Sequence, residues 1–243
     1  MTDPAQNTEP RILPAGADLL ADQAVAPIEP GMIVGLGTGR AANRGIVALA
    51  RRVRDERLDI ECVCSSAATR ELAQSLGLNV VSFDEMESID YSFDGADEVD
   101  RQLRMLKGHH GAITRQRLVA AVSKTNVYLA QEDKVVDHLG TRALLAVTII
   151  PFGYASTRNR LRELGLSGVV RKTMDGEVYI TEGGGVVYDM RLPENCDVEQ
   201  LALALDHVPG VVDHGLFLTE ADLVLVECRK GEVRRLTAHP ADR

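Results

Sequence analysis

Short apolar runs alternate with segments of helical periodicity along the first half of the chain. The apolar runs predict strands at 32–37 (MIVGLG), 59–65 (DIECVCS), 79–83 (NVVSF), 90–95 (DYSFDG) and 126–131 (NVYLAQ). The segments between them predict helices at 40–55, 67–77 and 112–124. This alternation is typical of βαβ units on a mostly parallel sheet. Ligands bind such sheets beyond the carboxyl ends of the strands, so the loops there are expected to form one site.

The pattern changes after about residue 142. Strands are predicted at 144–152 and within 169–187, with a hairpin turn at Asp175-Gly176, and helices at 158–165 and 199–208. These elements predict a small α+β unit, and the last apolar segment, 221–236, is expected to return to the main sheet or its edge. The predicted division is a larger α/β domain of residues 1–140 plus 216–243 and a smaller α+β domain of residues 141–215.

Composition and charge narrow the classes of ligand. The chain has 243 residues, 45% of them hydrophobic, and a net charge of -9 with a pI near 5.2. An acidic surface does not favour nucleic acid, so any anionic ligand must be held locally. No apolar run approaches the roughly 20 residues that span a bilayer, and the first 16 residues do not resemble a signal peptide. We therefore expect a cytoplasmic protein without a membrane partner.

The loop after the first strand is a candidate anion site. The sequence GLGTGR ends a strand and opens a helix, whose free N–H groups and dipole favour an anion. A tight strand-to-helix turn is the simpler alternative. Two serines that open the next helix either cap it or contact substrate. The residues concerned are Gly37, Thr38, Gly39, Arg40, Ala41, Ser65 and Ser66.

The segment DGADEVDRQLRMLKGHHGAITRQR combines carboxylates, a lysine and two adjacent histidines. Asp94 and Asp97 flank the Gly95-Ala96 turn at a strand end, a place that suits proton transfer but also an ordinary Asx turn. Lys107, next to Gly108, could compensate that charge or polarise an oxygen, while a solvated surface charge is the alternative.

His109 and His110 are candidate general bases, because a neutral imidazole accepts a proton near pH 7. Nearby aspartates are expected to raise the imidazole pKa. The adjacent side chains are expected to point in divergent directions, and no HxH or HxxxH spacing supports a metal. The four cysteines form no CxxC pair, which argues against a zinc ribbon. The sequence thus predicts neither a metal nor a cofactor.

Taken together, these loops resemble type A ribose-5-phosphate isomerase from about Ile28 to Val233. The matching motifs are GLGTG, SSAATRELAQSLG, DGADEVD, KG followed by GAITR, QEDKVVDHLG and HVPGVVDHGLF. The resemblance implies a Rossmann-like main domain with an inserted ferredoxin-like unit, usually assembled as a dimer or tetramer. It also implies an aldose-ketose isomerase that needs neither metal nor nucleotide.

The resemblance further implies an enediolate intermediate, with a glutamate after a KGGG loop shuttling the proton between C1 and C2. The aspartates at 94 and 97 and the lysines at 107 and 134 are retained, but the glutamate position is Gln116. The phosphate-binding GTGST is replaced by Gly37-Thr38-Gly39-Arg40-Ala41, and KGGG by Lys107-Gly108-His109-His110. Arg40 is expected to replace the lost hydroxyls, and Lys134 belongs to the same substrate site.

These departures leave three functions open. The first is an isomerase acting on a sugar phosphate or related anionic polyol, with His109 or His110 as base and weak or absent turnover of ribose 5-phosphate. The second is a catalytically silent sugar-phosphate-binding paralogue. The third is an enzyme of the same fold in which Gln116 donates a hydrogen bond in a different enediolate-type reaction.

Overall fold

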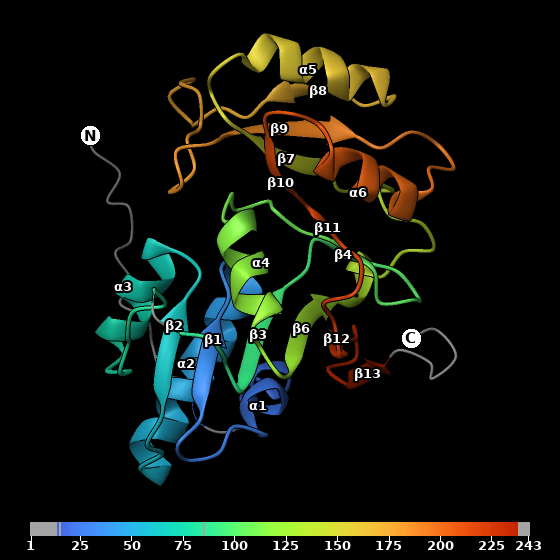
Figure 1. Cartoon of the computed structure of the whole chain (residues 1–243). Coiled ribbons are helices and arrows are strands. Elements are labelled where there is room, and N and C mark those ends of the chain that lie inside the picture. Colours follow the sequence, from blue (N-terminus) through green and yellow to red (C-terminus); the bar gives the residue numbers. More distant parts are fainter. Residues whose placement is uncertain (1–13, 15, 85, 238–243) are drawn as a thin grey trace, which may run out of the picture.

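Two β-sheet units, one above the other in Figure 1, organise the chain in the computed structural model, which describes residues 14, 16–84 and 86–237. The larger unit holds a six-stranded sheet in the order β13-β12-β6-β3-β1-β2, parallel except for β13. Its elements are α1 (Leu19–Val25), β1 (Ile33–Leu36), α2 (Arg40–Glu56), β2 (Glu61–Cys64), α3 (Ala67–Ser75), β3 (Tyr91–Gly95), α4 (Ile113–Ala121), β6 (Asn126–Gln131), β12 (Leu223–Glu227) and β13 (Val233–Thr237).

The order of the parallel strands determines where a ligand can enter. After β1 the chain moves outward to β2, and then crosses back to β3, β6 and β12 on the other side. The strand order therefore reverses between β1 and β3. In open α/β sheets the loops diverge at such a switch point and leave a crevice at the carboxyl ends of the strands.

Helices cover both faces of this sheet, and glycines allow their close approach. A Cβ added at Gly45 of α2 would lie 2.5 Å from the Phe93 ring, and one added at Gly35 of β1 would lie 2.6 Å from Val119 of α4. Successive side chains of a strand point to opposite faces. Because Phe93 faces α2, Asp94 faces α4, which lies in front of the sheet in Figure 1.

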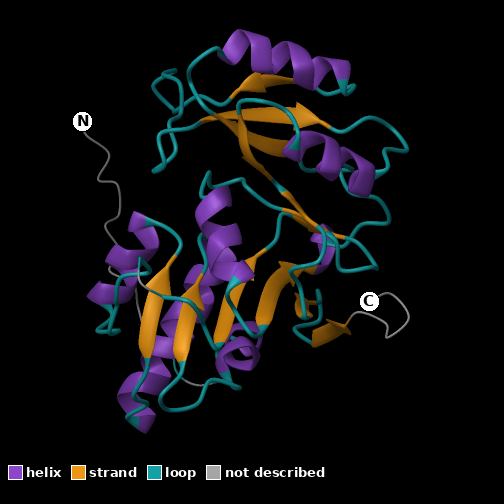
Figure 2. Cartoon of the chain, viewed as in Figure 1, coloured by secondary structure: helices purple, strands orange, loops and turns teal. Residues whose placement is uncertain are grey.

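The smaller unit has the order of elements β7 (Leu145–Ile149), α5 (Tyr154–Glu163), β8 (Ser167–Val170), β9 (Val186–Arg191), α6 (Val198–Asp206) and β10 (Val211–His214). Its strands form an antiparallel sheet, β10-β7-β9-β8, and both helices lie on it (Figure 2). This βαββαβ arrangement is the ferredoxin-like motif. The buried residues of the unit form their own cluster around Val147, Leu161 and Leu205.

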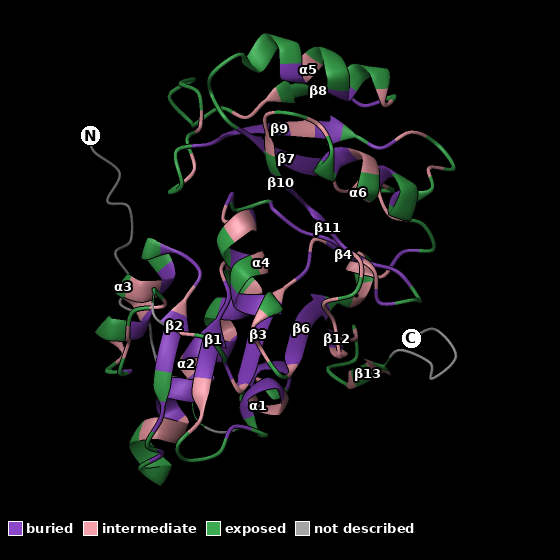
Figure 3. Ribbon diagram, in the orientation of Figure 1, coloured by how far each residue is buried: buried purple, intermediate pink, exposed green. Residues whose placement is uncertain are grey.

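A short antiparallel sheet of β4 (Glu98–Val99), β5 (Met105–Leu106) and β11 (Leu216–Phe217) joins the two units. Its residues are buried, as are most of the central strands in Figure 3. Lys107 follows β5 directly, and its backbone N–H donates to the Gly215 carbonyl 2.9 Å away. This buried sheet thus places the lysine between the units.

The α/β fold class is confirmed, with several differences in detail. The short strands β4, β5, β10 and β11 were not predicted. Segment 79–83, predicted as a strand, pairs with β2 only through a bridge between Cys62 and Val80, and a turn closed by Ser82 and Asp84 follows at once. Helix α1 was not predicted. The hairpin turn at Asp175-Gly176 is present, flanked by a bridge between Lys172 and Val178. The domain boundaries at 141 and 215 stay a prediction.

Within the described residues, no helix combines the length and the apolar character needed to cross a bilayer. Most of the first 16 residues, from which the lack of a signal peptide was inferred, lie outside the described part of the chain.

Candidate active site

The carboxylate of Asp94 lies at the switch point, where the loops after β1 and β3 meet. Its Oδ1 accepts hydrogen bonds from the backbone N–H groups of Thr38 at 3.1 Å and Gly95 at 2.7 Å. A Cβ added at Gly37 would lie 2.2 Å from the same oxygen. Glycine at position 37 is therefore needed for the carboxylate to reach the β1–α2 loop.

Two side chains bind the other oxygen of Asp94 and form what we call the inner cluster: Asp94, Lys107 and Gln116. The Oδ2 atom accepts from Lys107 Nζ at 2.9 Å and from Gln116 Nε2 at 2.7 Å. The three residues are 8%, 2% and 6% exposed, respectively. Hydrogen bonds to charged groups are stronger than neutral ones, and more so away from water. The cluster is therefore held rigidly.

Lys107 is fixed from several sides. Its Nζ also donates to the Gly95 carbonyl and lies 5.2 Å from the centroid of the Tyr128 ring and 5.5 Å from that of Phe217. An ammonium has three N–H donors. Among the described residues, Asp94 and Gly95 take two, which leaves one for a ligand oxygen.

The segment Gly108–Gly111, which we call the histidine loop, follows Lys107. Gly108 and Gly111 have φ angles of 114° and 76°, a region that side chains rarely adopt. A Cβ would lie 2.8 Å from Ala146 at the first position and 2.4 Å from the Tyr179 hydroxyl at the second. The two outer positions therefore require glycine, and only the two inner ones accept histidine.

The two imidazoles lie together, which corrects the expectation that they diverge. Their ring centroids are 5.1 Å apart and the planes meet at 85°, an edge-to-face contact. The His110 ring also lies against the start of α2, because a Cβ at Gly39 would be 2.4 Å from His110 Nε2. The backbone N–H of His109 donates to Asp97 Oδ2 at 3.0 Å.

The environment lowers the pKa of His110 below its ordinary value of 6.5. Burial of the ring is the main cause, and the neighbouring His109 adds to it, while Asp97 and Asp94 act in the opposite direction. The aspartates do raise the His110 pKa, as expected, but burial and His109 lower it by more. The expectation of a raised pKa is therefore wrong for His110. Its neutral form, the one that can accept a proton, is favoured.

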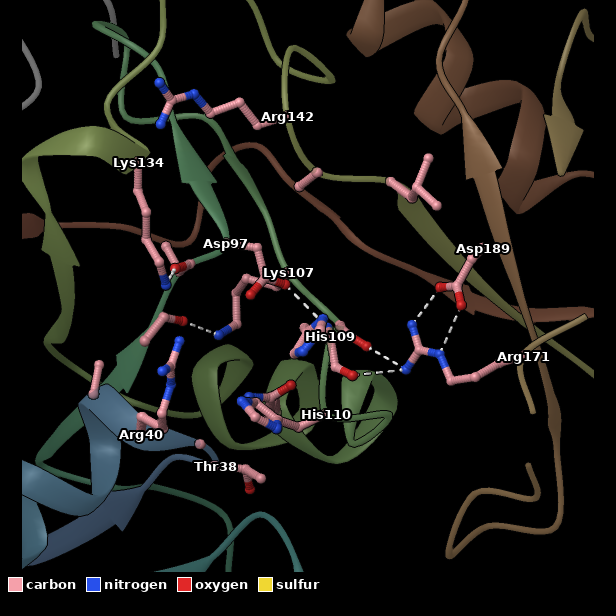
Figure 4. Close-up of a pocket in the computed structure, with 18 of the residues that line it drawn as sticks. Thr38, Arg40, Asp97, Lys107, His109, His110, Lys134, Arg142, Arg171 and Asp189 are labelled. Carbon is pink, nitrogen blue, oxygen red and sulfur yellow. Dashed lines mark hydrogen bonds and ion pairs between the residues drawn. The ribbon is translucent and has the colours of Figure 1, made fainter. Parts of the chain in front are cut away.

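These groups line a pocket of about 760 Å³ between the two units (Figure 4). Most of the sequence-predicted residues lie in its wall, namely Thr38, Gly39, Arg40, Ala41, Gly95, Ala96, Asp97, Lys107, Gly108, His109, His110, Gln116 and Lys134. Four others, Gly37, Ser65, Ser66 and Asp94, lie behind that wall.

The two serines support the β1–α2 loop from behind. Both are buried, and the Thr38 hydroxyl lies 2.8 Å from Ser65 Oγ and 2.9 Å from Ser66 Oγ. Ser66 also caps α3, because its Oγ accepts from the backbone N–H of Thr69 at 3.1 Å. The capping alternative for Ser66 is thus confirmed.

Two cations face the pocket near the start of α2. Arg40 is the first residue of that helix, is exposed, and has no hydrogen bond or ion pair with any described residue. Lys134 donates to the Ala96 carbonyl at 2.5 Å, and burial is the main reason why its pKa is lowered. Figure 4 shows both side chains on the same side of the pocket as Asp97. An anionic ligand would gain from both charges.

Sequence reasoning missed Asp133, which lies just after β6 in the larger unit. It also missed the part of the wall made by the second unit and its connection: Arg142, Ala143, Leu144, Arg171, Lys172 and Asp189. Glu98, which stands close to the predicted aspartates, anchors this connection instead of lining the pocket, and its carboxylate accepts the N–H groups of Gly140 at 2.6 Å and Ala143 at 2.7 Å. The basic pair Arg171-Lys172 at a strand end was the one signal available. Among the described residues, no cluster of histidine, cysteine or carboxylate side chains is arranged to hold a metal.

Comparison with known proteins gives one consistent result. The family model described as ribose 5-phosphate isomerase A (phosphoriboisomerase A) matches residues 61–231. A curated ribose-5-phosphate isomerase A from Desulfatibacillum aliphaticivorans is 39% identical over 219 residues, which cover 90% of this chain and 95% of the relative.

Solved structures similar to this chain are also ribose 5-phosphate isomerases. A ribose 5-phosphate isomerase A from Methanocaldococcus jannaschii superposes with a TM-score of 0.85 at 33% identity, covering 90% of this chain and 96% of that one. A D-ribose-5-phosphate isomerase in complex with phospho-erythronic acid superposes with a TM-score of 0.86 at 30% identity and the same coverage.

Proposed function

Because the chain belongs to the ribose 5-phosphate isomerase A family, we propose that it interconverts an aldose phosphate and its ketose, with the catalytic base supplied by the histidine loop. One observation carries this proposal. The Gln116 amide donates to Asp94, while the imidazoles of His109 and His110 line the same pocket. A neutral amide does not accept a proton near pH 7, whereas a neutral imidazole does.

The proposed reaction transfers one proton between adjacent carbons. An imidazole takes the proton from the carbon next to the carbonyl, which gives an enediolate and an imidazolium. The imidazolium then returns the proton to the former carbonyl carbon, and the hydroxyl proton moves to the other oxygen, so no atom is gained or lost. The remaining N–H of Lys107 is proposed to stabilise the oxyanion, and Asp97 to hold a hydroxyl group.

The proposed anion site lies around Arg40 and Lys134. The N-terminus of the 17-residue helix α2 and the guanidinium of its first residue favour a phosphate at the same place. A structural relative is solved with phospho-erythronic acid, a sugar acid phosphate. Its carboxylate resembles a planar, anionic enediolate, which makes this compound a suitable probe of the pocket. By analogy with the family, we expect a homodimer or homotetramer, which light scattering after size exclusion can test.

The decisive experiment is exchange of the C1 or C2 hydrogen with D₂O, followed by NMR over a panel of pentose and hexose phosphates and unphosphorylated sugars. We expect exchange with at least one sugar phosphate and weak turnover of ribose 5-phosphate. The double variant His109→Gly/His110→Gly should lose about 10² to 10⁴ in exchange rate, the usual contribution of a placed base. It should still bind phospho-erythronic acid in calorimetry.

The double variant, purified in the same way, also controls for host isomerase. Equal exchange in wild type and double variant would rule out the histidine loop as base. Binding of phospho-erythronic acid without exchange of any sugar would instead favour a silent binding protein. Exchange with a product other than the isomer would indicate a different enediolate-type reaction.

A further inference from the structure

The smaller unit reaches over the pocket through the segment between β8 and β9. We call residues 171–182 the strap. It contacts the larger unit at separate places: Glu182 accepts from the backbone N–H of Ala67 at the start of α3 at 2.8 Å and pairs with Arg115 of α4. Other strap residues contact the histidine loop. The strap therefore ties the ferredoxin-like unit to the elements that carry the candidate base.

Three successive carbonyls of the histidine loop accept hydrogen bonds from the strap. Arg171 Nη1 donates to the carbonyl oxygens of Gly108 at 2.8 Å and His109 at 3.0 Å, and the Tyr179 hydroxyl donates to that of His110 at 3.3 Å. With its carbonyls held on the strap side, the loop presents both imidazoles to the pocket, as Figure 4 shows.

The Arg171 side chain is itself held in place. Its Nε and Nη2 donate to the two carboxylate oxygens of Asp189 on β9, the first at 2.9 Å. The side chains of Arg171 and Asp189 are 14% and 22% exposed. The backbone N–H of Arg171 donates to the Val187 carbonyl at 2.7 Å. Because the Nε–Nη2 edge of this planar fork is bound to the carboxylate, the Nη1 group on its other side is directed toward the loop.

We propose that Arg171 is a positioning residue, which fixes the backbone of the histidine loop and so determines where the imidazoles of His109 and His110 lie. The effect of Arg171 on catalysis rests on the proposed function, but its effect on the position of the loop does not. Without the guanidinium, two carbonyls of the loop lose their donor, and the His110 ring can leave its place against Gly39.

The test is NMR titration of the six histidines in the full chain, with the His109 and His110 signals assigned from single glycine variants. The charged groups that face His110 are Asp97, Asp94, Lys107 and His109. Burial of the ring lowers the His110 pKa in the native loop, so Arg171→Met should move that pKa upward, toward 6.5. The matched control Arg160→Met, on the exposed part of α5, should leave it unchanged.

The double variant Arg171→Asp/Asp189→Arg distinguishes the effect of the ion pair from that of the hydrogen bonds to the loop. It can restore the pair but not the donors to the carbonyls, so it should titrate like Arg171→Met. For a substrate that wild type exchanges, kcat should fall about 10- to 100-fold with KM changed little, because small displacements of a reacting group are costly.

An unchanged His110 titration in folded Arg171→Met overturns the proposal. If that variant does not fold, Arg171→Lys takes its place: its ammonium keeps the charge beside Asp189 but lacks the fork, and it should shift the His110 pKa in the same direction by less. A wild-type titration curve in folded Arg171→Lys then overturns the proposal. The titration needs no substrate. It therefore tests the positioning role of Arg171 even if the protein proves not to be an isomerase.

Discussion

The inner cluster and the histidine loop border the same pocket but are built in opposite ways. Asp94, Lys107 and Gln116 are buried and bonded to one another, and Asp94 has a donor on each oxygen. His109 and His110 are exposed as whole residues, although the His110 ring is partly covered by Gly39, and neither ring makes a hydrogen bond with a described residue. The charged groups of the inner cluster are thus held in place by hydrogen bonds, whereas the imidazole nitrogens of the histidine loop are available to accept a proton. Changes in the first should therefore affect folding, and changes in the second should affect chemistry.

The largest expected effect is on stability, from Lys107→Met. Loss of the ammonium leaves the buried Asp94 carboxylate without its cation, and breaking a buried ion pair from one side costs about 3–5 kcal/mol. Urea unfolding measures the difference. The control is Lys172→Met, an exposed lysine of the same pocket, which should change the free energy of unfolding by less than about 0.5 kcal/mol. Equal losses in both variants would contradict the division into rigid and free groups.

The next largest effect is expected from Gln116→Glu in the His109→Gly/His110→Gly background, where it should restore part of the carbon-hydrogen exchange. The new carboxylate would replace an amide that now lies 2.7 Å from Asp94 Oδ2, and two carboxylates so close share a proton. The new carboxylate can act as a general base, so carbon-hydrogen exchange should increase at least about tenfold over the His109→Gly/His110→Gly variant. If exchange stays at the level of the double variant, position 116 no longer faces the reacting carbon.

A smaller effect is expected at the anion site. Arg40→Ala removes a guanidinium without any hydrogen bond to a described residue, so stability should hold, while phospho-erythronic acid should bind about tenfold more weakly, corresponding to ~1.4 kcal/mol. Calorimetry at two salt concentrations measures this. Arg54→Ala, in the last turn of the same helix, is the control. The same affinity in wild type and Arg40→Ala would mean that Arg40 does not contact the ligand.

The smallest effect concerns pH. Because the pKa of His110 in the folded protein lies below 6.5, the acid limb of exchange should lie below pH 6.5. The same shift predicts that the His110 contribution to stability is present above pH 6.5 and is lost as pH falls toward the lowered pKa, because the unfolded chain then binds the proton more readily. The free energies of unfolding of wild type and His110→Gly, measured between pH 5 and 8, test whether this contribution decreases as pH falls. An acid limb above pH 6.5 would assign the base to another group.

Most elements of the main sheet, and their order, could be predicted from the amino-acid sequence. Alternating apolar runs predicted the strands of the main sheet, and the change of pattern after residue 142 predicted the small α+β unit, because side-chain periodicity reflects which face of an element is buried. It also predicted most of the pocket wall, since the loops GLGTGR and DGAD follow strands β1 and β3, whose carboxyl ends meet at the switch point. The resemblance of these motifs to a known family also predicts that Gln116 departs from the family's glutamate, and this stays a prediction.

The surroundings of each of those residues could not be predicted from the sequence and follow from the tertiary structure. The edge-to-face contact of the two imidazoles, and the position of the His110 ring against Gly39 some 70 positions away in the chain, follow no sequence motif. The hold of Arg171 on the histidine loop joins residues 62 and 63 positions apart and follows no motif. Periodicity along a chain reports burial, but the partner of a buried or charged group is set by which elements the topology brings together.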